Sequence, residues 1–130
     1  MATLYVIDTH VLVWYFIGSK RLKPALRQKI DETRHQNGRL LVPTIVLAEA
    51  LDIAEKGRVD FDFSEMYRYI REEPEFDIIG FSPEIFNTII QISNIPELHD
   101  RIIVATARFY GTGILTKDRI ILESGEVQGL

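Results

Sequence analysis

The sequence contains no cysteine, which excludes disulfides, zinc–thiolate centres and thiol nucleophiles. This absence fits a reducing cytoplasm, which is the location that we expect. The longest apolar run, Val11 to Ile17, is far shorter than the roughly 20 residues that a membrane-spanning helix needs. The first residues, Met1 to Thr3, carry neither the basic start nor the small-residue cleavage site of a secretory signal peptide. We therefore expect no membrane partner.

An excess of positive charge is also missing. The chain has 15 Lys and Arg residues against 19 Asp and Glu residues, a formal net charge of −4 and a pI of about 5.4. A field of this sign argues against binding nucleic acid through overall charge. It does not exclude a nuclease whose acids form a cluster that bound cations neutralise. Composition therefore leaves the partner open.

The chain does have enough apolar residues to build a core. Its 130 residues, 46% of them hydrophobic, suit one domain that folds without covalent staples. No repeat, low-complexity tract or linker divides the sequence. We therefore expect residues 1–130 to form a single domain.

Short apolar runs alternate with helical patterns along the chain. Buried strands are predicted at residues 4–7, 40–43, 76–81 and 114–116. Helices are predicted at 11–17, from Pro24 to about Asn37, and at 44–56, 63–73, 82–92 and 98–110. The tail, 119–130, is expected to add a weak edge strand. This alternation predicts an α/β fold, a three-layer α/β/α sandwich with a mostly parallel central sheet of four or five strands.

Acidic residues follow the predicted strands where the chain leaves the sheet. Asp8 comes directly after the first strand, and Asp118 lies two residues beyond the last. Asp100 is in the first turn of the helix that leads into that last strand. Ligands of open parallel sheets bind at the carboxyl ends of the strands. We therefore expect the three carboxylates to meet at one edge of the sheet.

Glu49 is the single acid in an otherwise apolar stretch, residues 45–51. An unpaired buried carboxylate is costly, so this side chain must reach water, a partner or a metal. Its helix follows the second strand, so the long side chain can reach back toward the same sheet edge. An ion pair with an arginine of a neighbouring helix is the alternative.

Each acid taken singly has an ordinary structural explanation. Asp8, Asp100 and Asp118 can cap helices or favour the positive end of a helix dipole. Convergence of four acids, in a chain without another obvious nucleophile, instead favours a metal site. Clustered carboxylates need cations, and Mg²⁺ or Mn²⁺ prefers oxygen ligands. The predicted reaction is phosphodiester hydrolysis by an activated water.

Four segments around these acids share their motifs with a known family. They are Asp-Thr-His-Val-Leu-Val-Trp at 8–14, Ala-Glu at 48–49, His-Asp-Arg-Ile-Ile-Val-Ala-Thr-Ala at 99–107 and Leu-Thr-Lys-Asp at 115–118. In order and spacing they resemble PIN-domain ribonucleases, and more narrowly the VapC-type toxins of prokaryotic toxin–antitoxin pairs. The resemblance implies a PIN-like fold, endonucleolytic cleavage of RNA, a Mg²⁺ or Mn²⁺ centre, a homodimer and a cognate VapB-type antitoxin.

The same resemblance implies a role for each acid. Asp8 and Asp100 would be the principal metal ligands, and Asp118 would complete the site directly or through water. Glu49 would bind the ion or orient the attacking water. Thr116 would support the acids with its hydroxyl group.

Polar neighbours of the motifs carry weaker predictions. The resemblance also allows Thr9 to steady an acid with its hydroxyl group, but we expect it to be an ordinary strand or turn residue. His10 and His99 have no metal-ligand spacing to each other. Lys117 and Arg119 flank Asp118, and they are either RNA contacts or solvated loop charges.

Two other α/β classes also place an acid after their first strand. A phosphotransferase of the haloacid-dehalogenase type has a second Asp two residues later, where this chain has His10. A response-regulator receiver needs adjacent acids near its first strand. Both are disfavoured. Two alternatives within the resemblance stay open: an RNA-processing nuclease outside any toxin pair, and a non-catalytic PIN-type binding module.

Overall fold

In the computed structural model, which describes residues 3–129, the strands form one all-parallel sheet. They are β1 (Leu4–Ile7), β2 (Arg39–Pro43), β3 (Phe76–Ile79) and β4 (Gly113–Leu115), in the order β3–β2–β1–β4. β1 is central, because Val6 pairs with Leu41 of β2 on one side and Ile114 of β4 on the other. A parallel sheet covered on both faces requires strands that are apolar throughout, which is the pattern of these runs.

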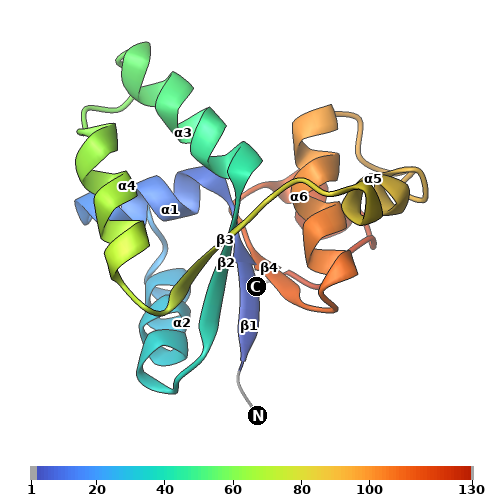
Figure 1. Cartoon of the computed structure of the whole chain (residues 1–130), viewed down its shortest axis with the longest axis horizontal. Coiled ribbons are helices and arrows are strands. Elements are labelled where there is room, and N and C mark those ends of the chain that lie inside the picture. Colours follow the sequence, from blue (N-terminus) through green and yellow to red (C-terminus); the bar gives the residue numbers. More distant parts are fainter. Residues whose placement is uncertain (1–2, 130) are drawn as a thin grey trace.

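Helices cover both faces of the sheet. The described residues contain α1 (Thr9–Ile17), α2 (Pro24–His35), α3 (Thr44–Glu55), α4 (Phe63–Glu72), α5 (Pro83–Ile89), α6 (Leu98–Phe109) and α7 (Arg119–Glu123). In Figure 1, α1, α2 and α4 lie on one side of the sheet, and α5 and α6 lie on the other. The predicted three-layer α/β/α sandwich with a parallel sheet is confirmed.

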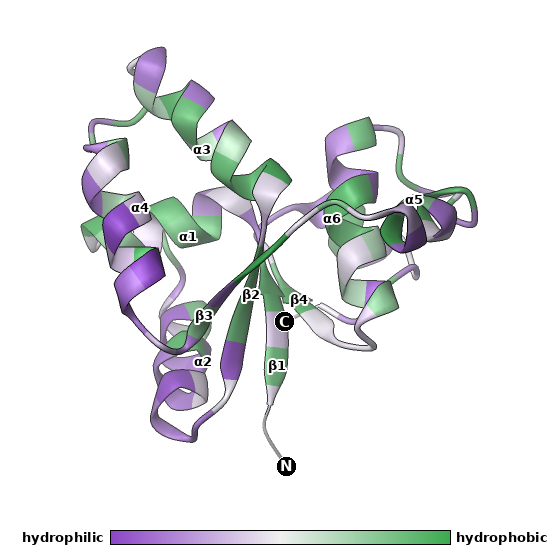
Figure 2. Cartoon of the chain, viewed as in Figure 1, coloured by the Kyte–Doolittle hydropathy of each residue, from purple (hydrophilic) through white to green (hydrophobic). Residues whose placement is uncertain are grey.

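Apolar residues concentrate where the layers meet. Figure 2 shows α1 and much of α3 as hydrophobic, whereas α2 and α4 are largely hydrophilic on their outer sides. Buried apolar side chains from Val6 to Ile121 form one contiguous cluster. Within residues 3–129, no helix combines the length and the apolar character that crossing a bilayer requires.

The prediction for the tail is wrong at residues 119–123, which form α7 and not an edge strand. At the end of the tail, an isolated parallel bridge joins Gly129 to Ile114 of β4. Leu130, the last residue of the predicted strand, lies outside the described residues, as do residues 1–2. The helix forms because the Asp118 carboxylate accepts hydrogen bonds from the backbone N–H groups of Ile120 (2.8 Å) and Ile121 (3.4 Å). Such a cap satisfies donors that a helix start otherwise leaves open.

The topology brings two distant segments together at the carboxyl edge of the sheet. Ile7 pairs with Leu115, so β1 and β4 end side by side. The backbone N–H of Asp8 extends this pairing by donating to the carbonyl oxygen of Leu115 (3.0 Å). α1 and α3 both begin at this edge, at the upper ends of β1 and β2 in Figure 1.

Candidate active site

Asp8 is held in place from both sides. It is the N-cap of α1, and its Oδ1 accepts a hydrogen bond from the Thr9 N–H (2.7 Å). Its Oδ2 accepts one from the Thr116 hydroxyl (2.5 Å). Burial raises the pKa of Asp8, the bonds from Thr116 and Thr9 lower it, and the charge of Asp118 raises it again; the net direction is upward. The two hydrogen bonds therefore fix the orientation of the carboxylate. Among the described residues, no cationic side chain forms a salt bridge with it.

Thr116 connects Asp8 to Asp118. The threonine is 1% exposed and directly follows β4. Its Oγ1 donates to Asp8 and accepts from the backbone N–H of Asp118 (3.0 Å). The predicted supporting position of Thr116 thus corresponds to a defined contact. Asp118 uses Oδ1 to cap α7, and no described group donates to its Oδ2.

Glu49 reaches the same edge from α3 through a contact that the sequence pattern does not predict. The Thr9 hydroxyl donates to Glu49 Oε1 (2.9 Å). Thr9 is 3% exposed, so it is a buried link between Asp8 and Glu49 and not an ordinary turn residue. Burial raises the pKa of Glu49, and the charges of Asp8 and Glu97 add to this effect, against lowering by Thr9 and His99. Among the residues that the structure describes, no salt bridge joins Glu49 to an arginine, so the alternative is not observed.

Asp100 has no hydrogen-bond donor among the described groups. It lies half-buried in the first turn of α6. Burial, followed by the negative charges of Asp118, Asp8, Glu49 and Glu97, raises the pKa of Asp100 to about 6. The charges that raise this pKa come from Asp8, directly after β1, from Glu49 of α3, and from Glu97 and Asp118. Asp100 therefore lies within electrostatic reach of these acids.

Glu97 is a fifth acid near the group, and the sequence pattern does not single it out. It is exposed and immediately precedes α6, where it affects the pKa of both Asp100 and Glu49. Its spacing, three residues before Asp100, was the available signal. Within residues 3–129, no salt bridge involves Asp8, Glu49, Glu97, Asp100 or Asp118.

The acids are gathered but do not form a ready-made metal cage. In the part of the chain that the structure describes, no group of three or more His, Asp or Glu side chains is already arranged to hold a metal ion. The donor chemistry nevertheless fits Mg²⁺ or Mn²⁺, because carboxylate oxygens lie together without a cationic side chain paired to them. Mg²⁺ commonly keeps several waters and binds through only one or two carboxylates. The metal-binding and catalytic roles of Asp8, Glu49, Asp100 and Asp118 stay predictions.

The raised pKa of Asp100 predicts how stability depends on pH. The folded protein takes up a proton at Asp100 near pH 6, whereas an Asp in the unfolded chain takes it up only near about pH 3.9. Lowering the pH from about 7 to about 5 therefore stabilises the metal-free fold at this residue. We expect Asp100→Asn to be more stable than wild type at pH 7. When the pH is lowered to about 5, the urea midpoint of wild type should rise relative to that of Asp100→Asn.

The control is Asp60→Asn, because Asp60 is exposed and has no salt bridge among the described residues. This variant should follow wild type at both pH values. An identical pH response in wild type and Asp100→Asn would contradict the electrostatic coupling of Asp100 to the other acids.

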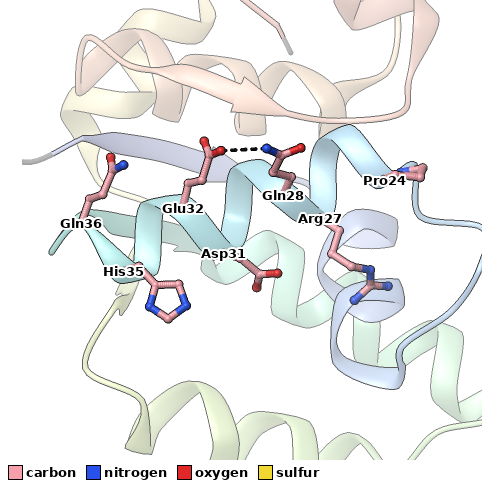
Figure 3. Close-up of a pocket in the computed structure, with 7 residues that line it drawn as sticks. All are labelled: Pro24, Arg27, Gln28, Asp31, Glu32, His35 and Gln36. Atoms are coloured by element: carbon pink, nitrogen blue, oxygen red, sulfur yellow. Dashed lines mark hydrogen bonds between the residues drawn. The ribbon is translucent and has the colours of Figure 1, made fainter.

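A hollow of about 450 Å³ on α2 is separate from this site. Figure 3 shows that its lining side chains project from α2 and the residue after it, with Gln28 donating a hydrogen bond to Glu32 (3.0 Å). None of the candidate acids lines this hollow. It is an open helix surface and offers no convergent catalytic groups.

Comparisons with known proteins agree with this fold. A family model described as "PIN domain" matches residues 5–126. Ribonuclease VapC22 of Mycobacterium tuberculosis is 28% identical over 119 residues, which cover 90% of this chain and 88% of that protein. A chain in the structure of VapBC2 from Rickettsia felis, bound to a DNA fragment from the promoter, has a TM-score of 0.76 at 14% identity and 98% coverage of both chains. A chain in a toxin–antitoxin complex from Klebsiella pneumoniae has a TM-score of 0.63 at 21% identity, covering 91% of this chain and 89% of that one. At these identities, the two structures show a shared fold.

Proposed function

The chain belongs to the PIN domain family, and from this premise we propose that it is a metal-dependent endoribonuclease and the toxin of a VapBC-type toxin–antitoxin pair. The observation that carries the proposal is the coupled group of Asp8, Asp100 and Asp118 at one sheet edge, with Glu49 beside it. The printed name of the relative, a ribonuclease, supports RNA as the substrate.

Asp8 and Asp100 are the proposed ligands for Mg²⁺ or Mn²⁺. When bound there, the ion offsets charge on a phosphoryl oxygen and makes a water molecule a stronger nucleophile. Asp118 already uses Oδ1 to cap α7, so Oδ2 is the oxygen that completes the site, directly or through water. The cluster needs such an ion, because unscreened carboxylates repel the phosphates of RNA.

The remaining residues orient groups and move a proton. Thr116 holds Asp8 at Oδ2, and Thr9 holds Glu49 at Oε1. With its pKa raised by burial and by Asp8, Glu49 is suited to accept a proton from the attacking water. No side-chain nucleophile is needed.

The proposed partners follow from the neighbours and from the surface. One similar structure is named as a toxin–antitoxin complex and another as VapBC2, which supports a cognate VapB-type antitoxin for this chain. Phe86 of α5 is 52% exposed, and Ile90, directly after this helix, is 72% exposed. Exposed apolar groups of this kind are common at protein interfaces. We therefore include a homodimer in the proposal, with the cytoplasm as its location.

Metal dependence tests the proposed function. We expect the purified protein to cleave single-stranded or structured RNA with Mg²⁺ or Mn²⁺, because the carboxylates cannot approach phosphate without a cation. Excess EDTA should abolish cleavage, and added Mn²⁺ should restore it, as followed by gel electrophoresis of end-labelled RNA. Full activity in excess EDTA would exclude this mechanism.

A further inference from the structure

A second hollow is lined in part by Glu49, one of the candidate acids. It has a volume of about 410 Å³, and its lining comes from α1, α3, the start of α6 and the residues just after α3. Glu49 is the one residue of the proposed catalytic group in this lining. The hollow, which we term the Glu49 pocket, therefore shares a wall with the proposed catalytic site.

The lining of the Glu49 pocket combines apolar and ring-bearing side chains. Ile45, Ala48 and Ile53 of α3 contribute apolar surface. His10 and His99 add two imidazole rings. Rings of this kind, together with apolar surface, form the platforms on which proteins stack unpaired bases. The His10 ring itself packs against Trp14, with the ring centroids 5.5 Å apart.

Arg58 gives the Glu49 pocket a planar group with several hydrogen-bond donors. Its guanidinium has no salt bridge or side-chain hydrogen bond among the described residues. The nearby acids already have partners, because Asp52 pairs with Lys56 (3.0 Å) and Glu49 accepts from Thr9. Arg58 is therefore free to stack on a base or to donate to its acceptor atoms.

Size and composition suit an aromatic organic group. The volume lies within the range of about 300–1,000 Å³ that is typical of small-molecule pockets. Apolar side chains, two imidazole rings and the donors of Arg58 line the pocket together. A flat heterocycle can use all three, because it stacks on rings and accepts hydrogen bonds at its edge.

We propose that the Glu49 pocket binds an unpaired nucleobase of the RNA, next to the phosphate that is cut. This inference rests on the proposed function, since the shared wall places such a base beside Asp8 and Glu49. Cleavage then requires an unstacked base, and the donors of Arg58 select among bases by their acceptor pattern. Single-stranded positions become the preferred sites of cleavage.

Binding of free nucleotides tests the proposal without relying on cleavage. AMP, GMP, CMP and UMP are titrated into the metal-free protein, with ribose 5-phosphate as the probe that lacks a base. NMR signals of the His10 and His99 rings and of the Arg58 side chain report binding. We expect at least one nucleotide to shift all three sets of signals saturably, and ribose 5-phosphate to leave the Arg58 signal unchanged.

Ala48→Phe fills the Glu49 pocket from an exposed position of α3, and its control is Leu51→Phe, which adds an aromatic ring at an exposed position of the same helix that does not line the pocket. Ala48→Phe should weaken nucleotide binding about tenfold or more, in line with the loss of one base stack, whereas Leu51→Phe should bind as wild type does. Should Ala48→Phe fail to fold, Arg58→Gln is expected to weaken binding. Its charge-matched control is Arg68→Gln, an exposed residue of α4 that does not line the pocket.

Equal shifts from ribose 5-phosphate and all four nucleotides would overturn the proposal, as would undiminished binding by Ala48→Phe or Arg58→Gln. Sequencing of cleavage sites in a mixed RNA separates this failure from failure of the proposed function. Metal-dependent cutting without a preferred base in both wild type and Arg58→Gln would refute the base pocket and leave the nuclease proposal intact. Nucleotide binding without any RNA cleavage would support the base pocket and refute the nuclease proposal.

Discussion

Replacing Asp8 with Asn is expected to lower the rate of RNA cleavage by roughly 10³-fold or more, because the change removes about 4 kcal/mol of transition-state stabilisation. The amide has nearly the shape of the carboxylate, and its oxygen can still accept the 2.7 Å hydrogen bond from the Thr9 N–H at the start of α1. The negative charge is lost, and with it the proposed metal ligand. Fold and function should therefore separate in this variant.

Three measurements check this result. Cleavage of end-labelled RNA with Mn²⁺ should disappear, far-UV circular dichroism should match wild type, and expression in a sensitive host should no longer stop growth. Asp60→Asn removes the same charge at an exposed position and should retain both cleavage and toxicity. Growth arrest by Asp8→Asn would point to an effect other than catalysis, and undiminished cleavage would remove Asp8 from the mechanism.

Replacing Arg34 with Gln is expected to destabilise the fold by about 3 kcal/mol, because it leaves hydrogen-bonded carboxylates without their partner. From α2, the guanidinium donates to Glu75 (2.9 Å) and Glu73 (2.7 Å), beyond the end of α4. It also donates to the hydroxyl groups of Tyr15 in α1 (3.0 Å) and Tyr69 in α4 (2.5 Å). One side chain, 15% exposed, thus joins three helices and the connection into β3.

The electrostatics of the Arg34 network support this expectation. Burial alone raises the pKa of Glu75, yet the hydrogen bond and charge of Arg34 hold it below its ordinary value. Burial and the bond to Asp31 raise the pKa of Tyr15 to about 12, against lowering by Arg34. Without the guanidinium, folding would still remove water from the Glu75 carboxylate and the Tyr15 hydroxyl group, but the hydrogen bonds from Arg34 would no longer replace it.

Urea unfolding, followed by circular dichroism, measures the loss. Arg119→Gln is the control, because its ion pair with Glu123 is exposed on a single helix and is worth roughly 0.5 kcal/mol or less. Arg34→Lys should recover only part of the stability, since an ammonium group cannot reproduce the planar fork. If Arg34→Gln unfolds within about 0.5 kcal/mol of wild type, the network contributes little net stability.

Local patterns were sufficient to predict much of the fold. The apolar runs at residues 4–7 and 40–43 specify buried strands, because a parallel sheet admits few polar side chains on either face. The tail failed for an equally local reason: helix capping was considered for Asp118, but residues 119–123 were nevertheless assigned to a strand, whereas the Asp118 carboxylate caps a helix there. Spacing alone does not show that one carboxylate both belongs to the candidate site and starts a helix.

The contacts within the site were harder to predict. The position of Thr9 next to Asp8 was the one indication in the sequence that this residue belongs to the site. Its hydroxyl, however, donates a hydrogen bond to Glu49, 40 residues along the chain. Arg34 likewise has the composition of an exposed helix residue, and its partners Tyr69 and Glu75 are 35 and 41 residues away. Sequence periodicity carries information over one or two helical turns, so such pairs lie beyond its reach.

By itself, the sequence determined the class of fold and the positions of the acidic residues relative to the ends of the strands. Both follow from local chemistry, because apolar runs bury and carboxylates are placed by the strands that precede them. The tertiary structure decided the rest: the Thr116–Asp8 hydrogen bond across 108 residues, the raised pKa of Asp100 and the pocket behind Glu49. Each of these depends on how β1, β4, α3 and α6 approach one another, and that approach is set by packing of the whole core.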